Sequence, residues 1–140
     1  MRKADIIVIG SGPAGMEVAA RALAAGLDTV VIERGELGGT CLNRGCIPTK
    51  ALCRSAEVAA QVREAAAYGV EVTGFKVDVA VAMARKDTVV TELRANVASM
   101  LSKAEIVTGT ARLVSSDVVA VDDRSFTAPK IVIATGSEAA

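Results

Sequence analysis

ADIIVIGSGPAGMEVAARALAAGLDTVVIE, residues 4–33, is the stretch that decides the fold of this chain. The continuous β-branched run over residues 4–9 predicts a fully buried strand, and residues 28–33 predict a second one. Between them a helix is expected over residues 13–26, because proline suits the first turn of a helix and glycine its end. A strand, a helix and a strand within about thirty residues are typical of a parallel βαβ crossover.

The remainder of the chain extends this unit. After a loop over residues 34–40, one helix is predicted from near Cys41 to residue 67, and another over residues 77–103, where apolar residues recur at helical spacing. Short β-branched runs separated by turn residues then predict a small antiparallel meander. Residues 130–135, KIVIAT, predict a buried strand that rejoins the parallel sheet. The predicted fold class is α/β, a parallel sheet with flanking helices and a small antiparallel β-meander.

Composition excludes several classes of partner. The 140 residues suit one domain, and 16 basic residues balance 16 acidic ones, so no net charge favours nucleic acid or an anionic membrane. The apolar runs are too short to cross a bilayer or to form a signal peptide. We therefore expect a cytoplasmic protein, where three cysteines favour a catalytic or metal-binding role over a structural disulfide. Histidine is absent, which excludes a Cys–His or Ser–His dyad within this chain.

The glycine-rich segment GSGPAG, residues 10–15, follows the first predicted strand and opens the first predicted helix. This G-x-G-x-x-G context indicates a Rossmann-like site for an ADP-containing dinucleotide, although a βα turn without a ligand is the alternative. The first glycine would permit a tight turn, the second the approach of a pyrophosphate, and the third the packing of helix on strand. Glu33, at the end of the next strand, would accept hydrogen bonds from a ribose 2′-hydroxyl. The residues assigned to the turn are Gly10, Gly12, Pro13, Ala14 and Gly15.

Two cysteines, Cys41 and Cys46, lie in GGTCLNRGCIPTK, residues 38–50. A zinc site needs about four ligands, whereas the chain has no histidine and one further thiol. A structural disulfide would close a loop too small to stabilise much, and two inert core thiols are another alternative. We favour a redox pair and predict no metal site.

The spacing of the two cysteines has a geometric consequence. Residues five apart in a regular helix rise about 7.5 Å, beyond the usual Cα separation of a disulfide of about 4.4–6.8 Å. A bridge therefore requires a distorted first turn, which Gly45 and Pro48 could provide. Cys53 is seven residues beyond Cys46, too far to join the bridge, and we expect it to be a small buried apolar residue.

Three segments, VIGSGPAG (8–15), VVIERGELGGTCLNRGCIPTK (30–50) and IVIATGS (131–137), together resemble the flavin domain of the pyridine nucleotide-disulfide oxidoreductases. The resemblance covers essentially the whole chain. It implies FAD in the glycine-rich turn. It also implies that Cys46 faces the flavin as the charge-transfer thiol, while Cys41 exchanges with a dithiol or disulfide substrate.

The resemblance implies further FAD contacts, residue by residue. Glu33 would hold the adenosine ribose, and Lys50 would lie on the N5 side of the flavin. Arg34 flanks the adenosine side, although both Arg34 and Arg44 suit surface charges better than ligands. The other implied contacts are Gly38, Gly39 and Thr40 along the pyrophosphate and ribityl chain, Ala111 at the adenine, and Ala134, Thr135 and Gly136 along the FAD.

Members of this family are much longer chains. Residues 1–140 are therefore expected to form the FAD-binding domain, incomplete and inactive by itself, without the NAD(P)-binding and dimerisation domains. The pattern C-L-N-x-G-C-I-P favours the dihydrolipoamide dehydrogenase type, a homodimer that uses NAD and acts on a small dithiol or a lipoyl domain. A glutathione- or mercuric-reductase-like member and a non-catalytic, thiol-sensing dinucleotide-binding module are the alternatives.

Overall fold

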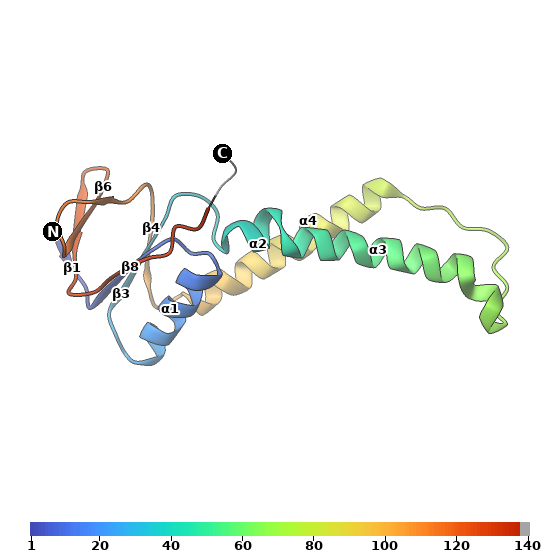
Figure 1. The fold of residues 1–140 in the computed structure, drawn as a ribbon, viewed down its shortest axis with the longest axis horizontal. Helices are drawn as coiled ribbons and strands as arrows, with labels where there is room; N and C mark the ends of the chain where they lie inside the picture. Colours follow the sequence, from blue (N-terminus) through green and yellow to red (C-terminus); the bar gives the residue numbers. More distant parts are fainter. Residues whose placement is uncertain (138–140) are drawn as a thin grey trace.

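The computed structural model describes residues 1–137, so the last three residues of the predicted 1–140 domain lie outside the described residues. Its centre is a four-stranded parallel sheet (Figure 1). The strand order is β4 (Glu105–Thr108), β3 (Thr29–Glu33), β2 (Ile6–Ile9) and β8 (Ile131–Ile133). Helix α1 (Pro13–Ala24) connects β2 to β3, which confirms the predicted βαβ crossover.

The elements of this crossover are shorter than predicted. Strand β2 begins at Ile6 rather than residue 4, and β3 begins at Thr29 rather than residue 28. Helix α1 ends at Ala24, and the glycine expected to end it, Gly26, follows with a φ of 77°. Glycine adopts this left-handed conformation without the steric cost that a side chain would carry, which explains its place just beyond the helix.

A second sheet packs on one face of the parallel sheet. Its strand order is β1 (Arg2–Lys3), β7 (Arg124–Thr127), β6 (Val118–Val121) and β5 (Arg112–Leu113). The predicted antiparallel meander is confirmed in β5, β6 and β7, while β1, which was not predicted, pairs in parallel with β7. Phe126 and Val119 of the meander are fully buried against Ile7 and Val30 of the parallel sheet.

The opposite face of the parallel sheet is covered by helices. Buried side chains of α1, α2 and α4 meet Ile6, Val8 and Val31 there. Strand β8 closes one edge of the sheet, and the prediction of a buried strand over 130–135 is wrong in part. The strand covers only Ile131–Ile133, and the Ile133 side chain is 62% exposed, because an edge strand has a neighbour on one side alone.

The predicted helix from Cys41 to residue 67 is in fact three elements: α2 (Gly39–Arg44), α3 (Cys46–Glu64) and a short 3₁₀ helix η1 (Ala65–Tyr68). The break lies at Gly45, whose φ of −126° and ψ of −107° are not helical. The second long helix, α4 (Val79–Met100), is shorter than the predicted 77–103. It begins at Val79 because the Asp78 carboxylate accepts a hydrogen bond from the Val81 N–H and caps it.

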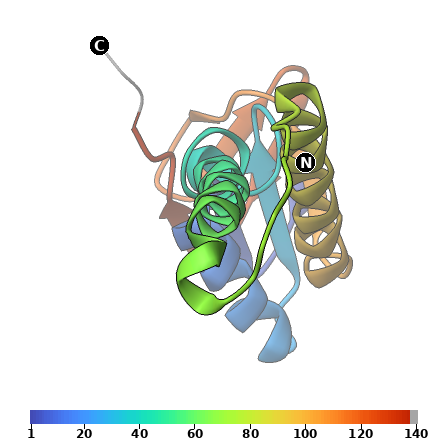
Figure 2. The ribbon, with the colours of Figure 1, turned by 90° about the vertical axis from the view of Figure 1, so that its right-hand side faces the viewer.

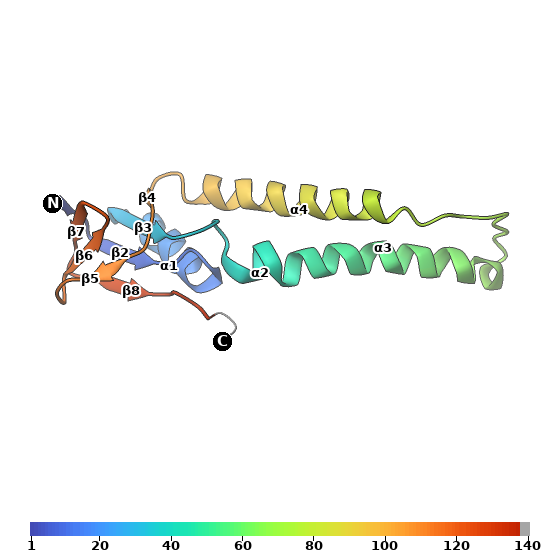
Figure 3. The same ribbon diagram turned by 90° about the horizontal axis from the view of Figure 1, so that it is seen from above.

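Helices α3 and α4 form a long hairpin, connected by η1 and residues 69–78, that projects away from the two sheets (Figures 1 and 3). Figure 2 looks along this hairpin toward the sheets. Ala51 is the buried residue of α3, since the helix packs mainly against α4. The prediction that Cys53 is buried is therefore wrong: its side chain is exposed on α3. Within residues 1–137, no helix has the length and apolarity needed to cross a bilayer.

Candidate functional site

The glycine-rich turn between β2 and α1 is tightly packed at its first and third glycines. Gly10 has a φ of 98°, and a Cβ atom there would lie 2.3 Å from the Ala134 carbonyl oxygen. A Cβ on Gly15 would lie 1.9 Å from the Gly10 carbonyl oxygen. Both positions therefore exclude any side chain, which fits the tight turn expected at Gly10 and the helix-on-strand packing expected at Gly15.

The second glycine of the turn faces another glycine instead. A Cβ on Gly12 would meet the Gly39 Cα atom at 3.8 Å, an ordinary van der Waals contact. Gly39, with a φ of 66°, leaves no room for a side chain, because its Cβ would lie 2.6 Å from the Gly12 Cα atom. The N-terminal ends of α1 and α2 thus approach each other through bare backbone.

A cavity of about 860 Å³ opens beside this contact, at the carboxyl ends of β2, β3, β4 and β8. Its size lies within the range of ligand sites, and its place is where parallel α/β sheets bind ligands. Twelve of the predicted site residues line it: Gly10, Gly12, Pro13, Glu33, Arg34, Gly39, Thr40, Cys41, Ala111, Ala134, Thr135 and Gly136. These residues come from five separate parts of the chain, which the fold brings to one cavity.

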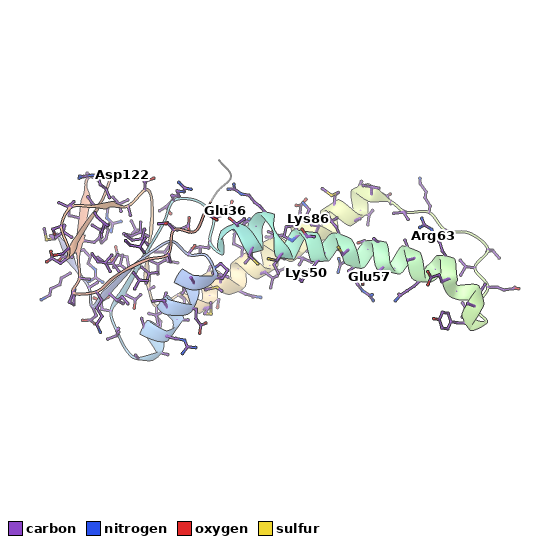
Figure 4. The ribbon with its side chains drawn as sticks, viewed as in Figure 1. Glu36, Lys50, Glu57, Arg63, Lys86 and Asp122 are labelled. Atoms are coloured by element: carbon purple, nitrogen blue, oxygen red, sulfur yellow. The ribbon has the colours of Figure 1, made fainter. Side chains whose placement is uncertain are left out.

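Five predicted site residues do not line the cavity. Ala14 and Gly15 lie within α1, and Gly38 is buried, with its N–H donating to the Ser11 carbonyl oxygen. Cys46 and Lys50 lie on α3 with exposed side chains, and Figure 4 shows Lys50 on the helical hairpin. The flavin-side positions predicted for Cys46 and Lys50 are therefore not part of this cavity wall.

The cavity also includes residues that the sequence did not single out. Glu36, Asn43 and Arg94 carry polar side chains there, and Arg94 comes from α4. Asn43 lies inside the C-x₄-C segment and could have been noticed by position. Arg94 gives no local signal, because it is one of several charged residues on a long helix.

Glu33 is held in place at the edge of this cavity. One carboxylate oxygen accepts hydrogen bonds from the Ser11 N–H at 2.8 Å and the Ser11 hydroxyl at 2.6 Å, and the other accepts from the Gly35 N–H at 2.8 Å. Partial burial pushes the pKa of Glu33 upward. The hydrogen bonds from the Ser11 hydroxyl and from the N–H groups of Gly35, Ser11 and Arg34 outweigh it, so the pKa lies below its usual range.

Cys41 and Cys46 meet across the helix break at Gly45. Both are free thiols, and the thiol and backbone of Cys46 both affect the pKa of the Cys41 thiol. The distortion expected between the two cysteines is thus present. The Cys46 thiol, with a smaller contribution from burial, raises the pKa of Cys41, while the charge of Lys50 opposes the rise. Among residues 1–137, no three His, Cys, Asp or Glu side chains are grouped to hold a metal ion.

Comparisons with known proteins match this architecture. Residues 4–140 match the family model of pyridine nucleotide-disulphide oxidoreductases. The chain is 44% identical to the dihydrolipoyl dehydrogenase of Chlamydia muridarum over 96% of its length, and 38% identical to that of Bacillus subtilis over 95%. It spans about 30% of the length of these curated relatives.

Among solved structures, the chain is similar to the HOCl-induced flavoprotein disulfide reductase RclA of Escherichia coli, solved as a Cu(II) complex. The TM-score is 0.79 and the sequence identity 29%, over 97% of this chain and 28% of that one. The chain thus combines the parallel sheet, the glycine-rich turn and the C-x₄-C segment. Its sequence also matches this family over nearly its whole length. The chain belongs to the pyridine nucleotide-disulphide oxidoreductase family.

Proposed function

We propose that this chain is the FAD-binding part of a dithiol/disulfide oxidoreductase in which Cys41 and Cys46 are the redox pair. In the whole protein the reaction would convert dihydrolipoamide and NAD⁺ to lipoamide, NADH and a proton. The observation that carries the proposal is that the two cysteines flank the helix break at Gly45, where their thiols influence each other, while Cys41 lines the cavity. Relatives named dihydrolipoyl dehydrogenase support the lipoyl substrate.

The residues around the cavity fit FAD. The depressed pKa of Glu33 keeps an ionised acceptor ready for a ribose diol. The bare backbones of Gly12 and Gly39 admit a pyrophosphate, and the first N–H groups of α1 have no partners within the helix. Thr40 and residues 134–136 form further parts of the wall. When bound, FAD would supply a two-electron carrier between the dithiol and the nicotinamide nucleotide.

The thiol chemistry follows from the oxidised form of the pair. A substrate thiolate attacks the Cys41 sulfur, so that a substrate–Cys41 disulfide forms and Cys46 leaves as a thiolate. The second substrate thiolate then attacks the substrate sulfur, which releases Cys41 and closes the substrate disulfide. The substrate loses two electrons and two protons, and the pair gains the electrons. Because the chain contains no histidine, the protons pass to solvent or to a base elsewhere in the whole protein.

The absorption spectrum of the purified whole protein, before and after two-electron reduction, tests this proposal. We expect flavin bands and, in the wild type after two-electron reduction, a long-wavelength thiolate–flavin band. Cys46→Ser should lack this band, whereas Cys41→Ser, which has no disulfide to reduce, should show it before any reduction. A correctly folded protein without flavin absorption would refute the proposal.

One observation favours a second candidate, a non-catalytic thiol-sensing module that binds a dinucleotide. Cys46 and Lys50 lie outside the cavity wall, and a sensor needs the thiols without a flavin-side lysine. The same spectrum separates the two, since a sensor would bind a dinucleotide without a thiolate–flavin band.

We further propose that the whole protein is a cytoplasmic homodimer that adds NAD(P)-binding and dimerisation domains to residues 1–140. The length of the relatives supports the extra domains. Three free thiols, with Cys53 exposed, suit a reducing compartment.

A further inference from the structure

The side-chain amide of Asn43 closes the turn that precedes α2. Its nitrogen donates to the carbonyl oxygens of Gly39 at 2.9 Å and Leu37 at 3.0 Å, with a longer contact of 3.4 Å to that of Glu36. This turn places Gly38 and Gly39 at φ values of 98° and 66°. Because Cys41 follows two residues later, the amide of Asn43 helps to determine where its thiol lies.

Arg94 holds the other end of the same amide. From α4, its Nε and Nη2 atoms donate to the Asn43 Oδ1 atom at 3.1 and 2.9 Å, and its guanidinium also forms an ion pair with Glu36. With Oδ1 engaged, the amide nitrogen must point to the carbonyl groups of the turn. Figure 4 shows Glu36 where the helical hairpin meets the sheets, so α4 is connected to the start of α2 at this point.

We propose that Arg94 is a positioning residue for the redox pair, which acts through Asn43 to hold the 36–39 turn and thereby the contact between Cys41 and Cys46. The catalytic meaning of this inference rests on the proposed function. The positioning of the two thiols by Arg94 does not itself depend on a bound flavin. If the protein bound no flavin, the proposed function would fail, while the positioning by Arg94 would still be measurable.

Arginine suits this position better than lysine. A planar guanidinium can donate two hydrogen bonds to one amide oxygen and still pair with a carboxylate, whereas an ammonium on a flexible stem is a point charge. The side chain of Arg94 is 34% exposed, so its contacts compete with water only in part. Arg94→Lys is therefore expected to restore some, but not all, of the positioning.

The test measures how fast each thiol reacts with iodoacetamide in the fully reduced whole protein, as a function of pH. Trypsin separates the three thiols onto different peptides, because it cuts after Arg34, Arg44, Lys50 and Arg54. Cys53, exposed on α3, serves as the internal reference for general loosening of the protein. Arg85→Met is the matched control, since Arg85 also lies on α4 and donates from Nη1 to the Ala51 carbonyl oxygen at 3.1 Å.

In Arg94→Met we expect the Cys41 rate, relative to Cys53, to rise about fivefold, as for the loss of one hydrogen bond. Its pH profile should move to lower pH, since the Cys46 thiol raises the pKa of Cys41. Asn43→Asp, which keeps an acceptor for Arg94 but loses the amide donor, should behave in the same way. Arg85→Met should leave the ratio unchanged.

Three results would overturn the inference. The first is an unchanged ratio and pH profile in Arg94→Met. The second is a parallel rise at Cys41 and Cys53, which would mean general unfolding. The third is a normal ratio in Asn43→Asp beside an altered one in Arg94→Met, which would show that Arg94 does not act through the amide.

Discussion

The carboxylate of Glu33 accepts two hydrogen bonds from a single residue, Ser11, one from its N–H at 2.8 Å and one from its hydroxyl at 2.6 Å. Ser11 is fully buried at the turn between β2 and α1, and Glu33 ends β3. The buried serine therefore connects the glycine-rich turn to the acid that is expected to hold a ribose.

Removal of the Ser11 hydroxyl should weaken dinucleotide binding. In Ser11→Ala, Glu33 keeps its backbone donors but loses the shortest of its hydrogen bonds, so its pKa should rise and its orientation should loosen. We expect the affinity for FAD to fall about tenfold or more, as for a hydrogen bond of about 1.5 kcal/mol to a charged group. Titration calorimetry on the apoprotein measures it.

Thr29→Val is the matched control for that experiment. Thr29 is also buried on β3, at the end away from the cavity, and its hydroxyl donates to the Leu27 carbonyl oxygen at 2.9 Å. It should lower the stability to a similar degree and leave FAD affinity unchanged. Equal losses of affinity in the two variants would contradict the role assigned to Ser11.

The depressed pKa of Glu33 predicts a pH dependence of stability. Because the folded-state pKa lies below the ordinary value of about 4.5, the hydrogen bonds of the carboxylate contribute stability above pH 4.5. That contribution is lost as the pH falls through the folded-state pKa. The free energy of unfolding of the wild type, relative to Glu33→Gln, should therefore decrease on acidification below 4.5, as measured by urea denaturation. If the difference in unfolding free energy between the wild type and Glu33→Gln stayed constant at all pH values below 4.5, the prediction would be wrong.

The close contact between Gly12 and Gly39 predicts that Gly39→Ala blocks the cavity wall. The new Cβ would lie 2.6 Å from the Gly12 Cα atom, at a φ of 66°. We expect FAD binding to be lost. An alanine in the left-handed conformation costs about 1–2 kcal/mol, and the free energy of unfolding should fall by more than that. Thermal unfolding and flavin content measure the two effects.

Gly69→Ala supplies the control for the backbone term alone. Gly69 has a similar φ of 74°, but nothing lies within 4 Å of its Cβ position. This variant should lose about 1–2 kcal/mol and keep full flavin binding. If Gly39→Ala lost no more stability or flavin than Gly69→Ala, the contact with Gly12 would not contribute to either.

The helix break at Gly45 predicts that Gly45→Ala slows disulfide formation between Cys41 and Cys46. Alanine favours a helix over glycine by about 1 kcal/mol, and its Cβ would lie 3.2 Å from the Thr40 carbonyl oxygen. Either a continuous helix or a shifted turn would separate the thiols. The rate of disulfide formation with an added oxidant should fall several-fold, whereas Gly26→Ala, which lies beyond the end of α1, should oxidise at the wild-type rate. Wild-type oxidation in Gly45→Ala would refute this.

Much of the parallel sheet and its glycine-rich turn could be predicted, because their signals are local. Each signal depends only on the conformational preferences of its own segment. This holds for the buried strand runs, the proline at the start of α1 and the three glycines of the turn. The break at Gly45 was also accessible, since it follows from the distance that two cysteines must cover. The predicted ends of strands and helices were less accurate. Asp78 begins α4 through capping, and Gly45 separates α2 from α3 through its backbone conformation, and neither effect is part of the hydrophobic pattern.

The errors and omissions share another cause. Cys53 is exposed because α3 packs mainly against α4, and β8 is exposed at Ile133 because it closes the sheet edge. Arg94 reaches Asn43 across 51 positions of sequence. Each of these facts depends on which elements become neighbours.

The sequence by itself therefore determined the βαβ unit, the glycine-rich turn and the cysteine pair, since each depends on conformational preferences within a few residues. Only the tertiary structure decided which residues share the cavity, that Ser11 orients Glu33 and that Arg94 holds Asn43. The physical reason is that hydrogen bonds and burial between distant segments exist only after the helices have packed on the sheet.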